Sequence, residues 1–417
     1  MKNLSDLAIN GGKAIRVNKF PPRALIGLEE KQAVDRLFDE VIAAGSSIVY
    51  NGNAEKEYEK AFVDFMGAGF ADGVNSGTNS VFCALGALQL EPFSEIIVPP
   101  ITDPGGIMPV VMLGCIPIVA DSDRRSYNLC AETIEAVITE RTRAIVVAHI
   151  AGEPADIEPI IKLARKHNLY VVEDCAQAHG AEYKGRKVGS FGDIAAFSTM
   201  FGKHHCTGGQ GGVVFTQNEK LHWQGRRFAD RGKPFGLDGV DSNVTAGLNC
   251  NLNDLSATIG TVQLRKLPKI LEKRRIIGEQ IKKGLPNSDA VSIGWQVPDS
   301  KCAYWFLRFK IVQNKLSVSK DEFCKALMAE GIEGIMPSYR HIPCEGKWFK
   351  DRSVFGKSGF PWSCSEYKGN KNPLFKIDNA LKAVEEHFNL LINEGCGQQE
   401  IEDIIAAINK GERAFLK

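Results

Sequence analysis

The sequence lacks long apolar runs, since no stretch reaches the roughly 18 apolar residues that a membrane-spanning helix needs. Its N-terminal stretch, MKNLSDLAINGGKAIR, also lacks the apolar core of a signal peptide. An excess of one charge sign is missing too: charged residues make up 24% of the chain, but the formal net charge is only +1. Nucleic acid and anionic membranes are therefore poor partners. We expect a soluble, cytoplasmic protein that acts on a small molecule.

Grouped cysteines are also absent, although the chain contains eleven of them. They are scattered, with no C-x-x-C pair and no Cys/His cluster at the spacing of a zinc site. This pattern is typical of reduced thiols in a cytosol. We therefore expect no metal site.

What the sequence does contain, from about residue 70 to 216, is an alternation of short apolar runs with helical patterns. Runs that are apolar at every residue suit strands covered on both faces, as in a mostly parallel sheet flanked by helices. The fold class is therefore α/β, with ligands bound beyond the carboxyl ends of the strands. The runs are EIIVPP near 95, CIPIVA near 115, RAIVVAHI near 143, LYVVED near 169, DIAAFS near 193 and GGVVFT near 211.

The length of 417 residues predicts two domains, because it allows two sizeable cores. Residues 28–45 have apolar positions at helical spacing. Residues 252–285 predict one helix, a break near Pro268 and a second, bridging helix. A strand at AYWFLRFKIV, a helix at SKDEFCKALMAEGI and closing helices from about 376 to 410 follow. We expect a large domain over 1–267 and a smaller α+β domain over 268–417.

An acid ends one of the apolar runs, at Asp174 in the stretch VVEDCAQAHGA. A buried carboxylate that faces a ligand crevice requires a cationic partner. A protonated pyridine nitrogen would serve, because the ion pair keeps the ring cationic and able to withdraw electrons. A plain helix N-cap explains Asp174 equally well.

Lysine follows the next run, which ends at Ser198, after five residues in a glycine-bearing loop. Such a lysine, Lys203, can form a Schiff base if desolvation or a nearby cation lowers its pKa. Most lysines are solvated surface charges, so Lys203 alone favours that plainer interpretation. Its neighbours in the sequence change the balance.

A candidate phosphate site lies upstream, where Ser76-Gly77-Thr78-Asn79 leads into an apolar helix. Gly77 would let the backbone approach closely, while Thr78, Asn79 and the helix N-terminus would direct hydroxyl and N–H donors at an anion. Taken alone, the stretch is an ordinary helix cap. The acid, serine and lysine that follow in order favour the phosphate site.

Six blocks in order give the sequence a resemblance to the pyridoxal-phosphate sugar aminotransferases of the DegT/DnrJ/StrS type. The branch it is most similar to contains scyllo-inosose aminotransferase and aminohydroxybenzoate synthase. The resemblance covers nearly the whole chain and implies the aspartate-aminotransferase-like fold, fold type I, with pyridoxal 5'-phosphate as cofactor. The blocks are SGTNS (76–80), AHIAGEPADI (148–157), EDCAQAHGA (173–181), GSFGDIAAFS (189–198), Lys203 and GLNCNLNDLSATIGTVQL (247–264).

The resemblance also implies roles for residues on the cofactor. Asp174 would pair with the pyridine nitrogen, Gln177 would contact the ring hydroxyl, and Lys203 would hold the cofactor as a Schiff base. Thr78, Asn79 and Ser198 would bind the phosphate.

Asn249 resembles a family asparagine that reaches the phosphate bound by the neighbouring subunit. That implies a homodimer with composite sites. The alternative is that Asn249 is only a turn residue.

One residue more than usual separates the lysine from the glycines that follow it, which leaves two candidates for the cofactor lysine position. Counting forward from Ser198 places Lys203 there, whereas counting back from Gly211-Gly212 places His204 there. Relatives with histidine at that position are sugar 3-dehydratases, which use the pyridoxamine form of the cofactor with histidine as base. We favour Lys203, because the glycines that follow can absorb an extra residue more easily than the tight step after Ser198.

Other departures concern the substrate. Asp103 stands where the family generally has an aromatic residue stacked on the cofactor, Asn251 where many relatives have arginine, and Gln210 where glutamate is usual. His149, His179 and His341 are interpreted as structural. The resemblance thus implies an aminotransferase that uses a glutamate or glutamine donor and a keto sugar or keto cyclitol acceptor. The alternative is a pyridoxamine-dependent keto-sugar 3-dehydratase with His204 as base.

Overall fold

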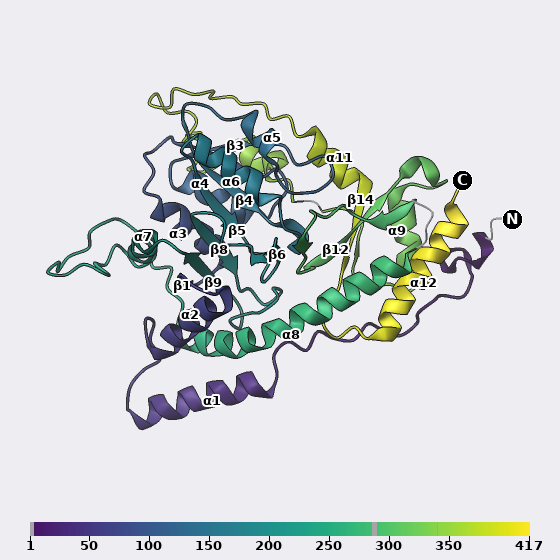
Figure 1. Ribbon diagram of the computed structural model, residues 1–417, viewed down its shortest axis with the longest axis horizontal. Coiled ribbons are helices and arrows are strands. Elements are labelled where there is room, and N and C mark those ends of the chain that lie inside the picture. The colour runs from purple at the N-terminus through teal and green to yellow at the C-terminus, as the bar shows by residue number, and fades with distance from the viewer. Residues whose placement is uncertain (1–3, 286–289, 340) are drawn as a thin grey trace.

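Seven strands form the central sheet of the protein, shown as a computed structural model in Figure 1. The structure describes residues 4–285, 290–339 and 341–417. The strands lie in the order β1-β9-β8-β5-β4-β2-β3, and β9 alone runs against the others. All six apolar runs form strands, so the mostly parallel sheet is confirmed. Their bounds are β1 (Phe70–Val74), β2 (Glu95–Val98), β3 (Ile116–Val119), β4 (Thr142–Ala148), β5 (Tyr170–Asp174), β8 (Ile194–Ser198) and β9 (Gly212–Thr216).

Helices flank this sheet and explain why its strands are apolar throughout. Every residue of β2, β3, β8 and β9 is buried, as expected for strands covered on both faces. The helix predicted over 28–45 is confirmed as α1 (Leu28–Ala43), which lies at the lower edge of the molecule in Figure 1. The helices that flank the sheet are α2 (Asn53–Met66), α3 (Gly77–Ala87), α4 (Met108–Met112), α5 (Ala131–Glu135), α6 (Ile157–Lys166) and α7 (Glu219–Ala229).

One long helix, α8 (Asp254–Gly284), crosses the molecule without a break, so the predicted interruption near Pro268 is wrong. A proline inside a helix costs about 3 kcal/mol, because it removes a hydrogen bond and crowds the preceding turn. Burying a leucine or isoleucine gains roughly 1.5–3 kcal/mol. Four such side chains flank the proline, and their combined burial outweighs the cost: Leu264, Leu267, Ile270 and Leu271.

A second sheet, of four antiparallel strands in the order β10-β12-β14-β13, occupies the other end of the molecule. The predicted strand at AYWFLRFKIV is confirmed as β12 and the helix at SKDEFCKALMAEGI as α9. The predicted closing helices are α11 and α12, with the unpredicted strand β14 between them. The bounds are β10 (Val291–Ile293), β12 (Phe306–Ile311), β13 (Ile335–Met336), β14 (His387–Leu391), α9 (Lys320–Ala329), α10 (Lys347–Lys350), α11 (Asp378–Glu386) and α12 (Gln398–Phe415).

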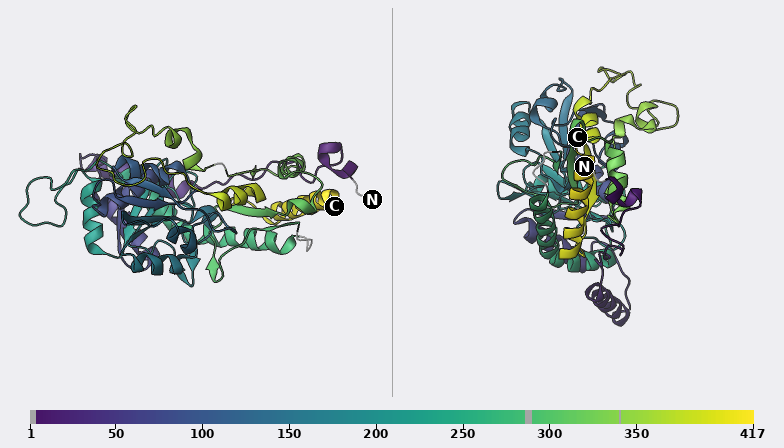
Figure 2. Two further views of the ribbon diagram at one scale, coloured as in Figure 1. Left: turned by 90° about the horizontal axis from the view of Figure 1, so that it is seen from above. Right: turned by 90° about the vertical axis from the view of Figure 1, so that its right-hand side faces the viewer.

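The predicted domain boundary at 267/268 stays a prediction. Segments from each side of it pack into the core of the other side. Leu7 belongs to the apolar core of the four-stranded sheet, whereas Phe349 and Trp362 pack into the core of the seven-stranded sheet. The first described residues lie beside α12 at one end of the molecule, and the loop after α7 projects from the opposite end (Figures 1 and 2). A three-stranded sheet is also present, from β6 (Glu182–Tyr183), β7 (Arg186–Lys187) and β11 (Ser300–Lys301). No helix in the described part of the chain is long and apolar enough to cross a membrane.

A buried ion pair links the two sheets. Arg308 in β12 donates from Nη2 and Nε to Glu153 Oε2, at 2.8 and 3.1 Å, and Glu153 follows β4. Arg308 also donates to the carbonyl oxygens of Arg125 and Trp295. Burial raises the pKa of Glu153, and the guanidinium of Arg308 opposes this shift. Glu153 therefore depends on Arg308 to remain ionised in the interior.

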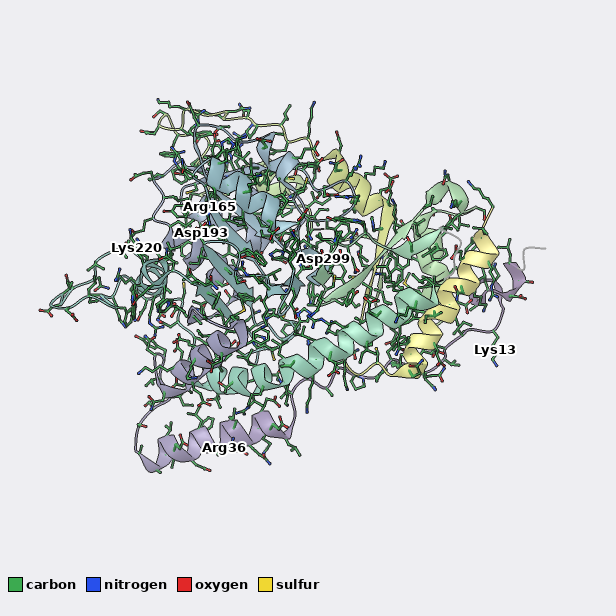
Figure 3. All side chains as sticks on the ribbon, viewed as in Figure 1. Lys13, Arg36, Arg165, Asp193, Lys220 and Asp299 are labelled. Atoms are coloured by element: carbon green, nitrogen blue, oxygen red, sulfur yellow. The ribbon has the colours of Figure 1, made fainter. Side chains whose placement is uncertain are left out.

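Replacing Arg308 with methionine should lower the free energy of unfolding by about 3–5 kcal/mol, because it leaves a buried carboxylate without its partner. The double variant Arg308→Met/Glu153→Met should lose less than Arg308→Met alone. Denaturant unfolding followed by circular dichroism measures both. The matched control is Arg165→Met, because Arg165 pairs with Asp193 at 3.0 Å on the surface (Figure 3). That change should cost about 1 kcal/mol or less. Equal losses for Arg308→Met and Arg165→Met would contradict the prediction.

Candidate active site

A cavity of about 220 Å³ opens at the carboxyl ends of β5 and β8. It is closed on one side by the N-terminus of α3 and on another by the short helix η3 (Pro104–Gly106). This is where the sequence predicts a ligand site. A larger groove between α1 and α8, of about 630 Å³, includes none of the predicted site residues. The cavity is lined by Ser76, Gly77, Thr78, Val81, Asp103, Gly105, Gly106, Asp174, Ala176, Ser198, Met200, Lys203 and Gln210.

The start of α3 has the properties of an anion site. Ser76 caps the helix by accepting a hydrogen bond from Asn79 N at 3.1 Å. The backbone N–H groups of Gly77 and Thr78 belong to the first turn, where no helical carbonyl can accept from them. A Cβ at position 77 would lie 2.4 Å from Ser198 Cβ, so only glycine lets β8 and the helix approach this closely. A phosphate fits between them.

Asn79 is placed differently from the other predicted phosphate residues. Its Nδ2 donates to Asn75 Oδ1 at 2.6 Å, and it is not among the residues that line the cavity. A contact between Asn79 and phosphate therefore stays a prediction.

Asp174, the last residue of β5, is buried at 7% exposure and lines the cavity. Its Oδ1 accepts a hydrogen bond from Ala176 N at 3.0 Å, but turns rather than a helix follow, so the alternative that Asp174 is a helix N-cap is wrong. Burial nevertheless raises the pKa of the carboxyl, and the Ala176 N–H and the charge of Lys203 offset this only in part. Among the described residues, none forms an ion pair with Asp174 within 4.0 Å. A protonated ring nitrogen would supply the missing cation.

Gln177 lies behind the cavity and is held at both ends of its amide. Its Oε1 accepts from Ala151 N at 2.9 Å, and its Nε2 donates to the Tyr339 hydroxyl at 2.9 Å. A side-chain amide has two N–H donors, so one remains for a ring hydroxyl.

Lys203 is the only cationic side chain that lines the cavity among the described residues, and it is 7% exposed. Burial lowers the pKa of its amine to about 8, although the negative charges of Asp174 and Asp103 act against this shift. A neutral amine is the nucleophile and the base, so the environment prepares this lysine for both tasks. Its Nζ lies 4.0 Å from the centroid of the Trp305 ring.

His204 does not face the cavity. It is fully buried, and its Nε2 donates to the carbonyl oxygen of Ala303 at 3.1 Å. Burial holds the pKa of this imidazole well below its usual value. Of the two residues that compete for the cofactor lysine position, Lys203 points into the cavity and His204 points away from it.

The other histidines have structural partners. His149 accepts from Ala155 N through Nδ1 at 3.0 Å, which leaves Nε2–H to donate to Glu173 Oε2 at 3.1 Å. His179 donates from Nε2 to the Ser198 carbonyl at 2.8 Å. His341 is exposed and its ring lies against Tyr339.

The residues that depart from the family pattern lie around the rim or outside it. Asp103 caps η3 through a hydrogen bond from Gly105 N to its Oδ1, at 2.9 Å, and Gln210 lines the cavity.

Asn249, the residue that resembles the family asparagine, is exposed and accepts a hydrogen bond from Asn251 Nδ2 at 2.7 Å. It forms a β-bridge with Asp230 at the base of the projecting loop. It does not line the cavity of its own chain.

The sequence reasoning missed Trp305 and Tyr339. Trp305 immediately precedes β12 and reaches Lys203, and Tyr339 holds Gln177. The aromatic character of AYWF was the only signal for Trp305, and it is equally typical of core residues.

A buried acid at the end of β5 and a lysine of lowered pKa in the loop after β8, on a sheet with one reversed strand, place this chain among the fold type I pyridoxal-phosphate enzymes. Residues 29–409 match the model of the DegT/DnrJ/EryC1/StrS aminotransferase family, and the chain belongs to that family. Pyridoxal 5'-phosphate is therefore its cofactor.

Relatives and solved structures agree with this assignment. A GDP-perosamine synthase from Caulobacter vibrioides is 35% identical over 300 residues, which cover 69% of this chain and 78% of that protein. The X-ray structure of an aminotransferase from Psychrobacter cryohalolentis is 29% identical, with a TM-score of 0.82 over 94% of this chain and 98% of that one. The structure of 3-amino-5-hydroxybenzoic acid synthase, at 21% identity and a TM-score of 0.77 over 96% and 99% of the two chains, shares the fold.

Gly77→Ala should weaken binding of pyridoxal phosphate, because the new methyl group collides with Ser198. Overpacking typically costs about 1–3 kcal/mol, which corresponds to roughly a 5- to 150-fold rise in Kd. Spectroscopic titration of cofactor-free protein measures the Kd. The control is Gly209→Ala, since an added Cβ there has no atom within 4 Å, and its Kd should stay within about twofold. Equal effects of the two changes would count against a phosphate bound at the start of α3.

Proposed function

We propose that this protein transfers an amino group from glutamate or glutamine to a keto sugar or a keto cyclitol. The family assignment supports aminotransfer. A sugar-like acceptor is supported by two similar proteins, the GDP-perosamine synthase and the 3-amino-5-hydroxybenzoic acid synthase. The observation that carries the proposal is Lys203, a buried amine of lowered pKa that shares one cavity with Asp174.

The residues present fit the cofactor. Asp174 would face the ring nitrogen, and the free N–H of Gln177 would reach the ring hydroxyl. Ser198 and the start of α3, at Gly77 and Thr78, would receive the phosphate. Lys203 would hold the cofactor covalently. Bound there, pyridoxal phosphate supplies an electron-withdrawing ring that stabilises negative charge on the carbon beside the amino group.

Lys203 is suited to moving the proton that aminotransfer requires. With a pKa of about 8, roughly a tenth of the amine is neutral at pH 7, whereas an ordinary lysine is almost wholly protonated. The neutral amine would take the proton from the carbon that carries the donor's amino group. The resulting ammonium would then give this proton to the C4′ carbon of the cofactor. Burial excludes the water that would otherwise compete for that proton.

The dehydratase alternative assigns the base to His204. A base must reach the proton that it removes, and His204 points away from the cavity with its Nε2 committed to Ala303. The geometry therefore favours aminotransfer.

A homodimer with composite sites is the second part of the proposal. Asn249 is exposed at the base of the projecting loop, as a residue that serves a neighbouring subunit would be. Helix α1 leaves Leu28 and Ile42 each 73% exposed beside the groove that it forms with α8. Exposed apolar side chains next to such a groove suit burial against a second copy.

Lys203→Ala should abolish transamination, measured by release of the keto acid from the donor, together with the visible absorbance band of the bound cofactor. Borohydride should fix the cofactor onto Lys203 in the unmodified protein, detected by peptide mass spectrometry. His204→Ala should keep both the colour and the covalent adduct. Colour that survives Lys203→Ala but is lost in His204→Ala would replace aminotransfer with the dehydratase alternative.

Composite sites are tested by mixing two inactive variants, Lys203→Ala and Asn249→Asp. Aspartate repels the phosphate of the neighbouring subunit, so each variant alone should be nearly inactive. A hybrid dimer has one site with both lesions and one intact site. Random mixing should therefore restore about a quarter of the unmodified activity. Activity equal to the mean of the separate variants would place Asn249 in the site of its own chain.

A further inference from the structure

Three consecutive residues of the lysine loop contact one short segment of the C-terminal half, Ala303–Trp305. The Gly202 carbonyl accepts a hydrogen bond from Trp305 Nε1 at 3.1 Å. Lys203 Nζ lies 4.0 Å from the centroid of the Trp305 ring. The Ala303 carbonyl accepts from His204 Nε2 at 3.1 Å. One segment, about a hundred residues further along the sequence, therefore contacts all three neighbouring loop residues.

The segment is itself held firmly. Ala303 N donates to the Gly152 carbonyl at 2.8 Å, and Trp305 N donates to the Ala151 carbonyl at 2.9 Å. Ala151 in turn donates its N–H to Gln177. A Cβ at Gly152 would lie 2.8 Å from Tyr304 N, so the two strands of chain are in close contact. Trp305 is therefore a fixed surface for the lysine.

The carboxylates near the lysine amine favour its protonated form. Asp174 at the end of β5 and Asp103 before η3 both raise the pKa of Lys203, against the larger effect of burial. His179 lies nearby and is kept neutral by burial. The negative face of an indole ring attracts an ammonium group, by about 0.5–2 kcal/mol depending on desolvation. The ring of Trp305 therefore adds to the two carboxylates.

We propose that Ala303–Trp305 is a clamp for the cofactor lysine, in which Trp305 is a positioning residue that holds the free amine of Lys203 in the cavity and His204 anchors the loop. Only the identity of Lys203 as the reacting amine is taken from the proposed function. The clamp also gives His204 a role other than that of a base. The residue after the lysine is turned inward to fix the loop.

The clamp acts when the lysine is not bonded to the cofactor. During turnover the amine is released and must stay within reach of the proton that it carries. A ring at 4.0 Å restricts the positions that the amine can take. Loss of the ring should therefore lower kcat more than it raises the KM of the amino donor.

Competitive labelling of amines, read by mass spectrometry across pH, measures the pKa of Lys203 in the cofactor-free full-length protein. Trp305→Leu removes an interaction that favours the ammonium, so the pKa should fall by roughly 0.4–1.5 units. The matched control is Trp295→Leu, since the Trp295 ring faces Arg125 at 3.8 Å rather than Lys203, and it should leave this pKa unchanged. An unchanged pKa in Trp305→Leu would overturn the proposal.

Two conservative variants separate positioning from simple stability, and they apply even if Trp305→Leu does not fold. Trp305→Phe keeps an aromatic face but loses the N–H to Gly202, so amide exchange in residues 199–207 should accelerate while the pKa of Lys203 stays near its original value. His204→Gln keeps an N–H for the Ala303 carbonyl and should exchange as slowly as the unmodified protein, whereas His204→Ala should exchange faster. Exchange unaltered in both Trp305→Phe and His204→Ala would remove the basis for a clamp.

Steady-state kinetics of the holoenzyme complete the test. Trp305→Leu should reduce kcat at least tenfold with less than a threefold change in the donor KM, and Trp305→Phe should recover most of kcat. A change confined to KM would contradict the proposal. Labelling and amide exchange need no substrate, so the clamp can stand even if no keto sugar or keto cyclitol is aminated.

Discussion

A buried amine and a buried carboxyl in one cavity are the constraint on which the rest of the site depends. Neither Lys203 nor Asp174 is stable as an isolated charge in the interior, and their pKa values shift in the opposite directions that burial dictates. The two groups attract each other without forming an ion pair within 4.0 Å. The arrangement is completed by a ligand that offers a cation to the acid and a carbon electrophile to the amine, which describes the family cofactor.

The sheet sets the separation of these groups. Asp174 pairs in register with Ala196 of β8, so the ends of the two parallel strands lie side by side. Ser198 then meets the start of α3, because Gly77 carries no side chain to hold them apart. The positions that we propose for the phosphate and the ring therefore depend on backbone pairing and on one glycine. The lysine loop is the part that needs further support, which Ala303–Trp305 provides.

The sequence predicts best what depends on local pattern. Six strands were recognisable because burial on both faces makes every residue apolar, and Asp174 stood out as an acid at the end of such a run. Pro268 misled because a local helix-breaking preference was outweighed by the burial of leucines and isoleucine on both sides. β14 was missed because it is a short strand between two helical patterns, whose pairing with β12 and β13 is long-range.

The contacts of the site that join distant parts of the chain could not be predicted from the sequence, and the position after the lysine shows why. Counting along the chain favoured Lys203 but left His204 as an alternative, since an insertion in a glycine-rich loop can be placed on either side. In this turn Lys203 faces the cavity, whereas the ring of His204 is directed to the Ala303 carbonyl. Two residues decide which one does so: the Ala303 carbonyl accepts a hydrogen bond from His204, and the Trp305 ring faces the amine of Lys203. The sequence could not decide between the two residues because the deciding contacts come from another part of the chain. One side chain, Lys203, lies in the ligand cavity, and its neighbour, His204, donates to a backbone carbonyl about a hundred residues away.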